Sequence, residues 1–220
     1  VSIWFLVFSI PFLFFIIKQK KHGTKKNYSS NLKKLLWNKK ISLLGKFLIA
    51  RMLYADGLNA IIVMGGIFAV GVFNLEIKDL LKLSIIMNIT AFIGAFIGGL
   101  ANDKFGSKIV IIISLIGLIS SSTIILFTFS VSTFLLLAGI NGLFIGPIQS
   151  ASRVVVTSIL NKNNQGKGFG LFATSGKLTS FIGPLLVSTV TFLTDSQRIG
   201  FSAAILLLLA GLIILLNIKK

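Results

Sequence analysis

Residues 109–127 read IVIIISLIGLISSSTIILF, a run of nineteen residues without a charged side chain. An α-helix rises about 1.5 Å per residue and the hydrocarbon core of a bilayer is about 30 Å thick, so about 20 apolar residues in a row are needed for one crossing. The run is therefore long enough to predict a membrane-spanning helix. Apolar stretches of similar length on either side of it are then expected to be further spans.

Six further apolar stretches flank this run. They extend approximately over residues 1–17, 47–73, 80–101, 133–160, 169–193 and 199–217. Short polar or basic segments separate them from one another. The pattern predicts an all-α protein, a polytopic membrane helix bundle with about seven spans. Because 109–127 and 199–217 carry no charge, we expect those two spans to face lipid.

The composition is typical of a bilayer protein. The chain is 55% hydrophobic and 12% charged, with a mean hydropathy of +0.96, whereas soluble domains are about a quarter charged. The net charge of +17 would suit a nucleic-acid-binding protein, but the basic residues lie between apolar runs and form no soluble basic face. We therefore expect a lipid bilayer as partner and no nucleic acid. The absence of cysteine excludes disulfides within the chain.

The distribution of lysine and arginine predicts the orientation in the membrane. Ten of the 22 basic residues lie between Lys18 and Lys46. If this segment is cytoplasmic, alternation of the spans puts sixteen basic residues on that side and three, Lys78, Lys82 and Arg198, on the other. Cytoplasmic loops carry such an excess of positive charge. We therefore expect the C-terminus to be cytoplasmic.

The beginning of the chain predicts that an upstream portion is missing. The first apolar run has no initial methionine, basic leader or small-residue cleavage site, so it resembles a span already in progress more than a signal peptide. The basic segment 18–46 that follows is open to two interpretations. It is either a solvated linker that maintains orientation or an interfacial helix, with Leu35, Leu36 and Trp37 among the lipid headgroups.

Four charged residues fall well inside predicted spans, whereas Lys82 lies at the outer end of its own. The four are Arg51, Asp56, Arg153 and Lys177. Charge at membrane depth is costly, so such groups face a bundle interior or a wet cavity and mark solute or ion pathways. Asp56 and Lys177 are predicted at the same depth, and Arg51 is shallow enough to extend its side chain to the interface. Since pairing an acid with a base offsets most of the burial cost, a contact between Asp56 and Lys177 is one hypothesis. The pair would be either functional or purely structural.

Polar residues in the same spans extend the predicted pathway. Asn141, Gln149 and Ser152 share a stripe of one span, and Asn59 lies three residues after Asp56. Two deep cations with one carboxylate favour an anionic or zwitterionic solute. We predict a solute and ion pathway formed by Asp56, Asn59, Asn141, Gln149, Arg153 and Lys177.

Glycine and proline predict two helix breaks, at Gly146–Pro147 and at Gly183–Pro184. Each proline leaves the carbonyl four residues earlier without its helical donor. In transporters, interrupted helices line binding cavities or serve as hinges, and close helix packing is an equally open explanation. For Gly94 and Gly98, which have the spacing of a small-residue contact motif, packing is favoured.

No residue pattern indicates an enzyme. The single histidine, His22, lies in the basic segment, and no span contains paired carboxylates for acid-base or metal chemistry. The sequence also lacks a glycine-rich nucleotide-binding loop. We expect no catalytic residue, cofactor or metal site. A non-transporting receptor or assembly partner remains an alternative to a transporter, and a membrane enzyme is the weaker one.

Residues 99–108, GLANDKFGSK, resemble the cytoplasmic loop signature of the major facilitator superfamily. The matching positions are Gly99, Asp103, Lys104, Gly106 and Lys108. Gly99 would permit close helix approach and Gly106 a tight turn. The resemblance implies that these residues act in conformational switching. It also implies twelve helices in two halves, of which this chain corresponds to helices six to twelve.

Three further blocks narrow the resemblance: ARMLYADGLN at 50–59, GPIQSASR at 146–153, and SGK to GP at 175–184. Together they are similar to the branch related to vacuolar amino-acid effluxers of autophagy, whose bacterial members mostly lack a defined substrate. This implies an ion-coupled secondary transporter of amino acids or similar small polar solutes, working by alternating access in a bacterial inner membrane. Residues 1–17 would be the last helix of a missing N-terminal half, 18–46 the central cytoplasmic loop and 47–220 the C-terminal half.

Overall fold

The structure, a computed structural model, describes residues 9–10, 36–38 and 40–218 of the 220-residue chain. The chain divides into two compact units, residues 1–34 and 35–220. In the first unit, Ser9 and Ile10 are described, as helix. The rest of the span predicted over 1–17, most of the 18–46 segment, and Lys219 and Lys220 lie outside the described residues. All other described residues belong to the second unit.

The second unit is a helix bundle preceded by a short strand pair. Trp37 of β1 pairs antiparallel with Ile41 of β2. The elements in chain order are β1 (Trp37–Asn38), β2 (Lys40–Ile41), α3 (Leu43–Phe73), α4 (Ile77–Phe105), α5 (Ser107–Phe127), α6 (Val131–Ile159), the 3-10 turn η1 (Lys162–Asn164), α7 (Gln165–Thr179), α8 (Ile182–Thr194) and α9 (Gln197–Leu216).

Six of these helical segments are long and apolar enough to cross a membrane, with α7 and α8 together counted as one. They confirm the polytopic all-α fold predicted for this part of the chain. Each of the six spans begins and ends within four residues of its predicted bounds. The local signals are clear at several ends: the Ser42 hydroxyl caps α3 by accepting from the Gly45 N–H at 3.0 Å. Asn74 ends the same helix in the left-handed conformation, at φ 53°.

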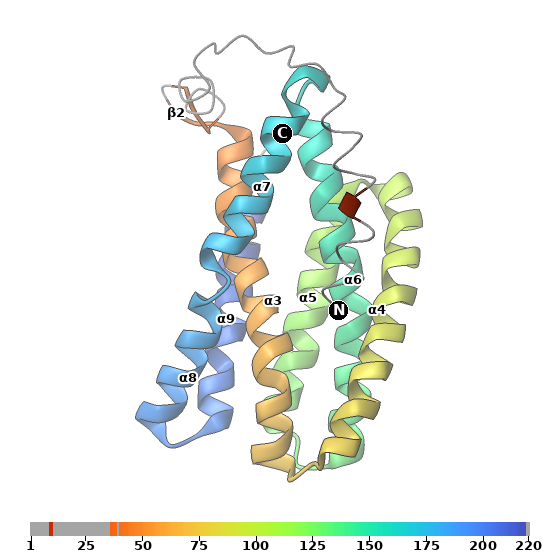
Figure 1. The fold of residues 1–220 in the computed structure, drawn as a ribbon, viewed down its shortest axis with the longest axis vertical. Coiled ribbons are helices and arrows are strands. Elements are labelled where there is room, and N and C mark those ends of the chain that lie inside the picture. Colours follow the sequence, from red (N-terminus) through yellow and green to blue (C-terminus); the bar gives the residue numbers. More distant parts are fainter. Residues whose placement is uncertain (1–8, 11–35, 39, 219–220) are drawn as a thin grey trace. The chain divides into compact units, whose positions relative to one another are not determined.

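The packing of the helices repeats after three spans. α3 packs on α9, and α6 packs correspondingly on α5. The contact of α4 with α6 has its counterpart in the contacts of α7 and α8 with α3. Since each repeat contains an odd number of spans, the second runs through the membrane in the opposite sense. Figure 1 shows the consequence, because the connections α3–α4, α5–α6 and α8–α9 all lie at one end of the bundle.

The expectation that 109–127 and 199–217 face lipid is wrong for half of their surface. In the most apolar stretches of α5 and α9, 44% and 50% of the residues are buried, against 11% in α4 and in α7–α8. A helix without charge is compatible with an apolar interior as well as with lipid, so the absence of charge does not distinguish the two. Small buried residues such as Ser121 and Gly211 let α5 and α9 pack closely.

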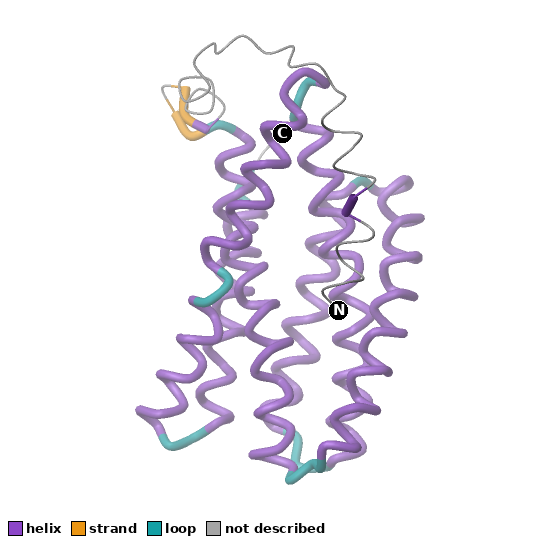
Figure 2. Tube along the Cα trace, viewed as in Figure 1, coloured by secondary structure: helices purple, strands orange, loops and turns teal. Residues whose placement is uncertain are grey.

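The predicted break at Gly146–Pro147 is also wrong, because α6 continues through Pro147. Pro147 cannot donate to the carbonyl of Leu143. That carbonyl lies against Gly94 of α4, where an added Cβ would overlap it. The ring of Pro147 faces Gly98, where an added Cβ would lie 2.6 Å from the proline Cβ. The neighbouring helix therefore accommodates the proline, and α6 remains unbroken (Figure 2).

The contact between α4 and α6 confirms that the glycine spacing serves helix packing. On α6, an added Cβ at Gly142 would overlap the Thr90 hydroxyl, and one at Gly146 would overlap the Ala91 carbonyl. Glycines from both helices thus bring the two backbones together. Close approach of this kind replaces the hydrophobic driving force, which is absent between helices in lipid.

Replacing Gly94 by alanine should destabilise the bundle, because the new methyl group meets the Leu143 backbone rather than a flexible side chain. Overpacking of this kind costs about 1–3 kcal/mol. We expect a lower Tm in thermal unfolding of the detergent-purified protein. Gly65→Ala is the matched control, since nothing lies within 4 Å of an added Cβ there. An equal Tm for the two variants would contradict close packing of α4 against α6 at Gly94.

Candidate functional site

A cavity of about 710 Å³ lies between α3, α6 and α7. Apolar side chains such as Leu58, Ile62, Ile148 and Phe169 form parts of its wall. Its polar lining comes from all three helices and from the residue that follows α7. These polar residues are Arg51, Tyr54, Asn59, Gln149, Ser152, Arg153, Lys177 and Ser180.

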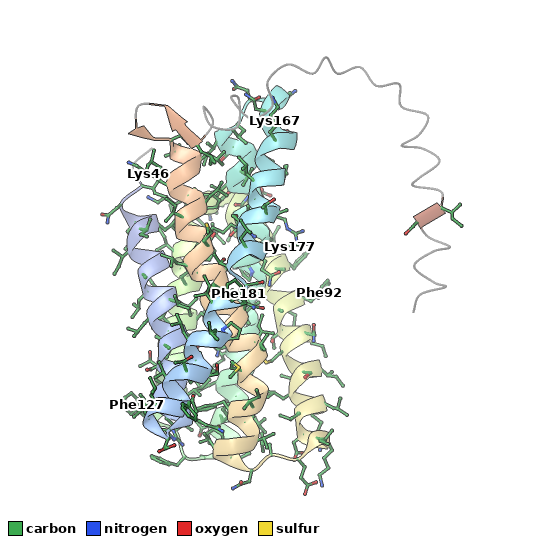
Figure 3. The ribbon with its side chains drawn as sticks, turned by 60° about the vertical axis from the view of Figure 1, so that its left-hand side comes forward. Lys46, Phe92, Phe127, Lys167, Lys177 and Phe181 are labelled. Carbon is green, nitrogen blue, oxygen red and sulfur yellow. The ribbon has the colours of Figure 1, made fainter. Side chains whose placement is uncertain are left out.

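Three cations converge on this cavity, each from a different helix: Arg51 of α3, Arg153 of α6 and Lys177 of α7. In the part of the chain that the structure describes, no carboxylate side chain lines the cavity. Figure 3 shows Lys177 near the end of α7, close to Phe181. The cavity therefore carries an uncompensated positive charge. The described residues also contain no group of three or more His, Cys, Asp or Glu side chains that could hold a metal ion.

Arg51, which was expected to extend toward the membrane interface, joins α3 to α7. Its Nη1 donates to the Phe172 carbonyl at 2.7 Å and to the Ser175 hydroxyl at 3.1 Å. The guanidinium carbon lies 3.5 Å from the centroid of the Phe172 ring, a cation–π geometry. Gly176 makes room for it, since an added Cβ there would be 2.8 Å from Nη1. The expectation considered depth alone, whereas the acceptors on α7 decide where the side chain goes.

Tyr54 and Ser152 join α3 to α6 in the cavity wall. Their side-chain oxygens are 2.8 Å apart and both residues are buried. Ser152 also donates to the Ile148 carbonyl at 2.5 Å, so the tyrosine hydroxyl is the donor of the shared bond. Sequence reasoning missed Tyr54, although it lies three residues after Arg51, as neighbours on one helix face do.

Asp56 lies outside the cavity, and its predicted ion pair with Lys177 is not formed. The residue is buried at 4% exposure, and it lies against the start of α8, near the backbone of Gly183. Among the described residues, the ion pairs are Lys78–Glu76 and Lys82–Asp79. At 3.6 residues per turn, Asp56 points about 140° away from Arg51 around α3. The helical period therefore indicates that Asp56 and Arg51 lie on different faces of α3. Depth in the membrane does not give that direction.

Asn59, Gln149, Arg153 and Lys177 line the cavity, but Asn141 does not. Asn141 is buried between α5 and α6, where it accepts from the Ser121 hydroxyl and donates to that of Ser122. It shares a stripe of α6 with Ser152, but eleven residues of helix separate the two by about 16 Å. The Asn141 side chain faces α5, so Asn141 belongs to a structural polar contact.

The loop at residues 99–108 makes a tight turn. Gly106 joins α4 to α5 at φ +84°, a conformation that glycine adopts without strain. Lys108 donates from Nζ to the Ile218 carbonyl at 2.6 Å and so fastens the end of α9 to the start of α5. Asp103 and Lys104 are exposed. Within this unit an added Cβ at Gly99 would meet open space, so the close helix approach expected there occurs at Gly94 and Gly98.

Comparison with known proteins identifies the family. The family described as vacuole effluxer Atg22 like matches residues 1–220. The chain belongs to this Atg22-like family. YxiO of Bacillus subtilis (strain 168), named an uncharacterized MFS-type transporter, is 24% identical over 220 residues, or 96% of this chain and 50% of that protein. Autophagy-related protein 22 of Candida glabrata is 29% identical over 190 residues, or 79% of this chain and 35% of that protein.

The Atg22-like chain thus spans half or less of the length of these relatives. A solved structure of the peptide transporter POT in complex with sulfate has a TM-score of 0.65 at 18% identity, and the match covers 79% of this chain and 37% of that one. At this identity the likeness shows the fold alone. It confirms the major-facilitator-type fold and, with the six candidate spans, a multi-pass membrane protein. The expectation that the chain is not an enzyme agrees with relatives that are named transporters.

Removing the Arg51 side chain should loosen α7. In Arg51→Leu, the two hydrogen bonds and the ring contact that hold α7 against α3 are lost. A hydrogen bond to a charged group contributes about 1.5–3 kcal/mol, so backbone amides of residues 165–179 should exchange with deuterium at least about tenfold faster. Arg153→Leu is the control, because this exposed cation makes no side-chain bond within the described residues. Equal exchange in the two variants would show that Arg51 does not hold α7.

Proposed function

We propose that the chain is the C-terminal half of a secondary transporter that moves small polar solutes bearing a carboxylate, such as amino acids, by alternating access. In this proposal residues 1–17 end the N-terminal half, 18–46 form the central loop and 47–220 form the six-helix half. The protein would reside in a bacterial inner membrane with its C-terminus in the cytoplasm. The observation that carries the proposal is the convergence of three cations on one cavity without a carboxylate in the described lining.

Three uncompensated cations at membrane depth are unfavourable unless an anion enters the cavity. The side chains of Arg153 and Lys177 make no hydrogen bond or ion pair with the described residues, so their donors are available to a solute. Arg51 holds α7 through Nη1, and its remaining guanidinium donors suit the planar geometry of a carboxylate. The volume of about 710 Å³ lies in the range of small-molecule sites.

The family relationship supports solute export by two rocking halves. Vacuole effluxer is the description of the family, and transporters of this fold bind their solute between two halves near the middle of the bilayer. The cavity here is formed by one half, so an N-terminal half would provide the opposite wall. We assign Gly99, Asp103, Lys104, Gly106 and Lys108 to switching between the two access states, because they lie at the α4–α5 turn, away from the cavity lining.

Asp56 is the residue that we assign to proton coupling. Among the described residues it is the carboxylate buried within a span, and its Oδ1 has no hydrogen-bond partner there. Of the helices packed against α3, α8 contains no ionisable residue and α9 contains only Arg198, in its first turn. α7 contributes Lys167 and Lys177, α6 contributes Arg153, and Lys46 and Arg51 lie on α3 itself. A buried carboxylate without an ion-pair partner is costly, and binding a proton removes that charge.

Neutralising either free cation of the cavity should weaken solute binding. In proteoliposomes containing the full-length protein, Arg153→Gln and Lys177→Gln should each raise the KM for amino-acid flux. Loss of a charge-assisted hydrogen bond of about 1.5–3 kcal/mol corresponds to about tenfold or more. Lys82→Gln, an exposed cation far from the cavity, should leave KM unchanged. The proposal is refuted if KM stays the same in both cavity variants, or if no carboxylate-bearing solute is transported.

Replacing Asp56 by asparagine should abolish the pH dependence of transport, because the amide keeps the size of the carboxyl group but cannot bind the proton. The measurement is initial flux as a function of external pH. Asp195→Asn is the matched control: Asp195 is exposed and left-handed at φ 48°, a conformation that asparagine tolerates well. A pH profile that persists in Asp56→Asn would exclude this coupling role.

A further inference from the structure

The span formed by α7 and α8 is broken between Thr179 and Ile182. Figure 2 shows this break as a short non-helical link in the middle of the bundle. Pro184 is its cause, since proline has no N–H and leaves the carbonyl of Ser180 without its helical donor. The predicted break at Gly183–Pro184 is therefore present, one turn earlier in the chain. Phe181 marks its position in Figure 3.

The orphaned carbonyl receives a donor from another helix. Asn59 of α3 donates from Nδ2 to the Ser180 carbonyl at 2.6 Å. At membrane depth a carbonyl without its helical donor is costly unless another group or cavity water supplies a hydrogen bond, and Ser180 borders the cavity. Asn59 thus compensates, from a neighbouring helix, for the hydrogen bond that Pro184 cannot make.

The second end at the break, the N-terminus of α8, is also held by α3. The first N–H groups of a helix have no intrahelical acceptor, and Phe181 at the N-cap position offers no side-chain cap. The buried Asp56 carboxyl group lies near the Gly183 N–H, where a negative charge also favours the helix dipole. The two backbones are in direct contact, since an added Cβ at Gly183 would be 2.5 Å from the Asp56 carbonyl oxygen and 3.0 Å from the Ala60 Cβ.

We propose that Asp56 and Asn59 form a clasp across the break, in which Asn59 holds the end of α7 and Asp56 holds the start of α8. The two residues are three apart on α3, so one face of that helix reaches both ends. They are positioning residues and not solute ligands: Asp56 lies outside the cavity lining, and the amide nitrogen of Asn59 is already engaged.

The clasp would determine where the end of α7 lies relative to the cavity. Gly176, Lys177 and Ser180, at or next to the last turn of α7, line the cavity. α8 packs on α9 and α3, whereas α7 packs on α3 and α6, so the break is the point where two differently anchored segments meet. The position of the Lys177 ammonium group follows from that geometry. This consequence for transport rests on the proposed function, whereas the clasp itself does not.

The clasp can be tested by spin-label distance measurements that need no solute. The chain contains no cysteine, so Thr174→Cys on α7 and Phe192→Cys on α8, both exposed, provide a label pair across the break. In the full-length protein we expect one narrow distance distribution. Asn59→Leu should shift and broaden it, and so should Asn59→Asp, which is nearly isosteric but presents an acceptor to the Ser180 carbonyl. Asp56→Ala should broaden it, whereas Asp56→Asn, which keeps an acceptor for the Gly183 N–H, should not.

A second substitution separates the clasp from a general loss of stability. Pro184→Ala returns an N–H to position 184, so the Ser180 carbonyl regains a helical donor and Asn59 becomes dispensable. The double variant Asn59→Leu/Pro184→Ala should recover the narrow distribution. If either Asn59 variant keeps the narrow distribution, or if Pro184→Ala fails to restore it, the clasp is overturned.

Transport kinetics provide the second arm of the experiment. Asn59→Leu should raise the KM for the transported solute by about tenfold, because the Ser180 carbonyl loses the donor that positions it, and Pro184→Ala should restore it. Broadened distances with an unchanged KM would confirm the clasp but refute its role in positioning Lys177. If no solute is transported by any variant, the proposed function fails, and the distance measurements still decide whether the clasp exists.

Discussion

A backbone carbonyl inside a bilayer needs a hydrogen-bond donor, because outside a cavity no water is available to it. Two prolines within the described spans each remove such a donor, and the fold responds to each differently. At Pro147 the freed Leu143 carbonyl packs against the bare Cα of Gly94, so α6 stays continuous. At Pro184 the freed Ser180 carbonyl accepts a hydrogen bond from Asn59 and the helix breaks. The arrangement of α3, α4 and α7 depends on these two solutions.

The position of the charges follows from that arrangement. Because α3 approaches both α7 and α8, its successive faces serve different purposes. The face with Arg51 is directed to α7 and the cavity, and the face with Asp56 is directed to the start of α8. The acid and the cations are thereby kept apart, although they occur at similar depth. A cavity with net positive charge and a separately buried carboxylate are the two features on which the proposed transport of anionic groups rests.

Much of the fold could be predicted from the sequence, for physical reasons. A bilayer requires about 20 apolar residues per crossing, so the spans between residues 43 and 216 were recognisable with small errors at their ends. The packing role of Gly94 and Gly98 was readable from their spacing. The tight turn at Gly106 and the family relationship followed from one short loop and three separated blocks of sequence.

The site was less predictable. Gln149, Arg153, Lys177 and Asn59 were identified because polar groups inside a span need a wet or polar surrounding. Asn141 satisfies the same criterion but pairs with serines of α5, and Tyr54, which lines the cavity, carries no such signal in the sequence.

The sequence by itself determined which segments cross the membrane, since crossing depends on the length and hydropathy of one segment at a time. Tertiary structure alone decided the partners. Which helix stands beside Asp56, and whether a proline breaks its helix or is accommodated by a neighbour, depends on residues far apart in the chain. The outcome depends on the packing of several helices together. The periodicity of one helix predicts the face on which a side chain lies but does not identify the helix that packs against that face.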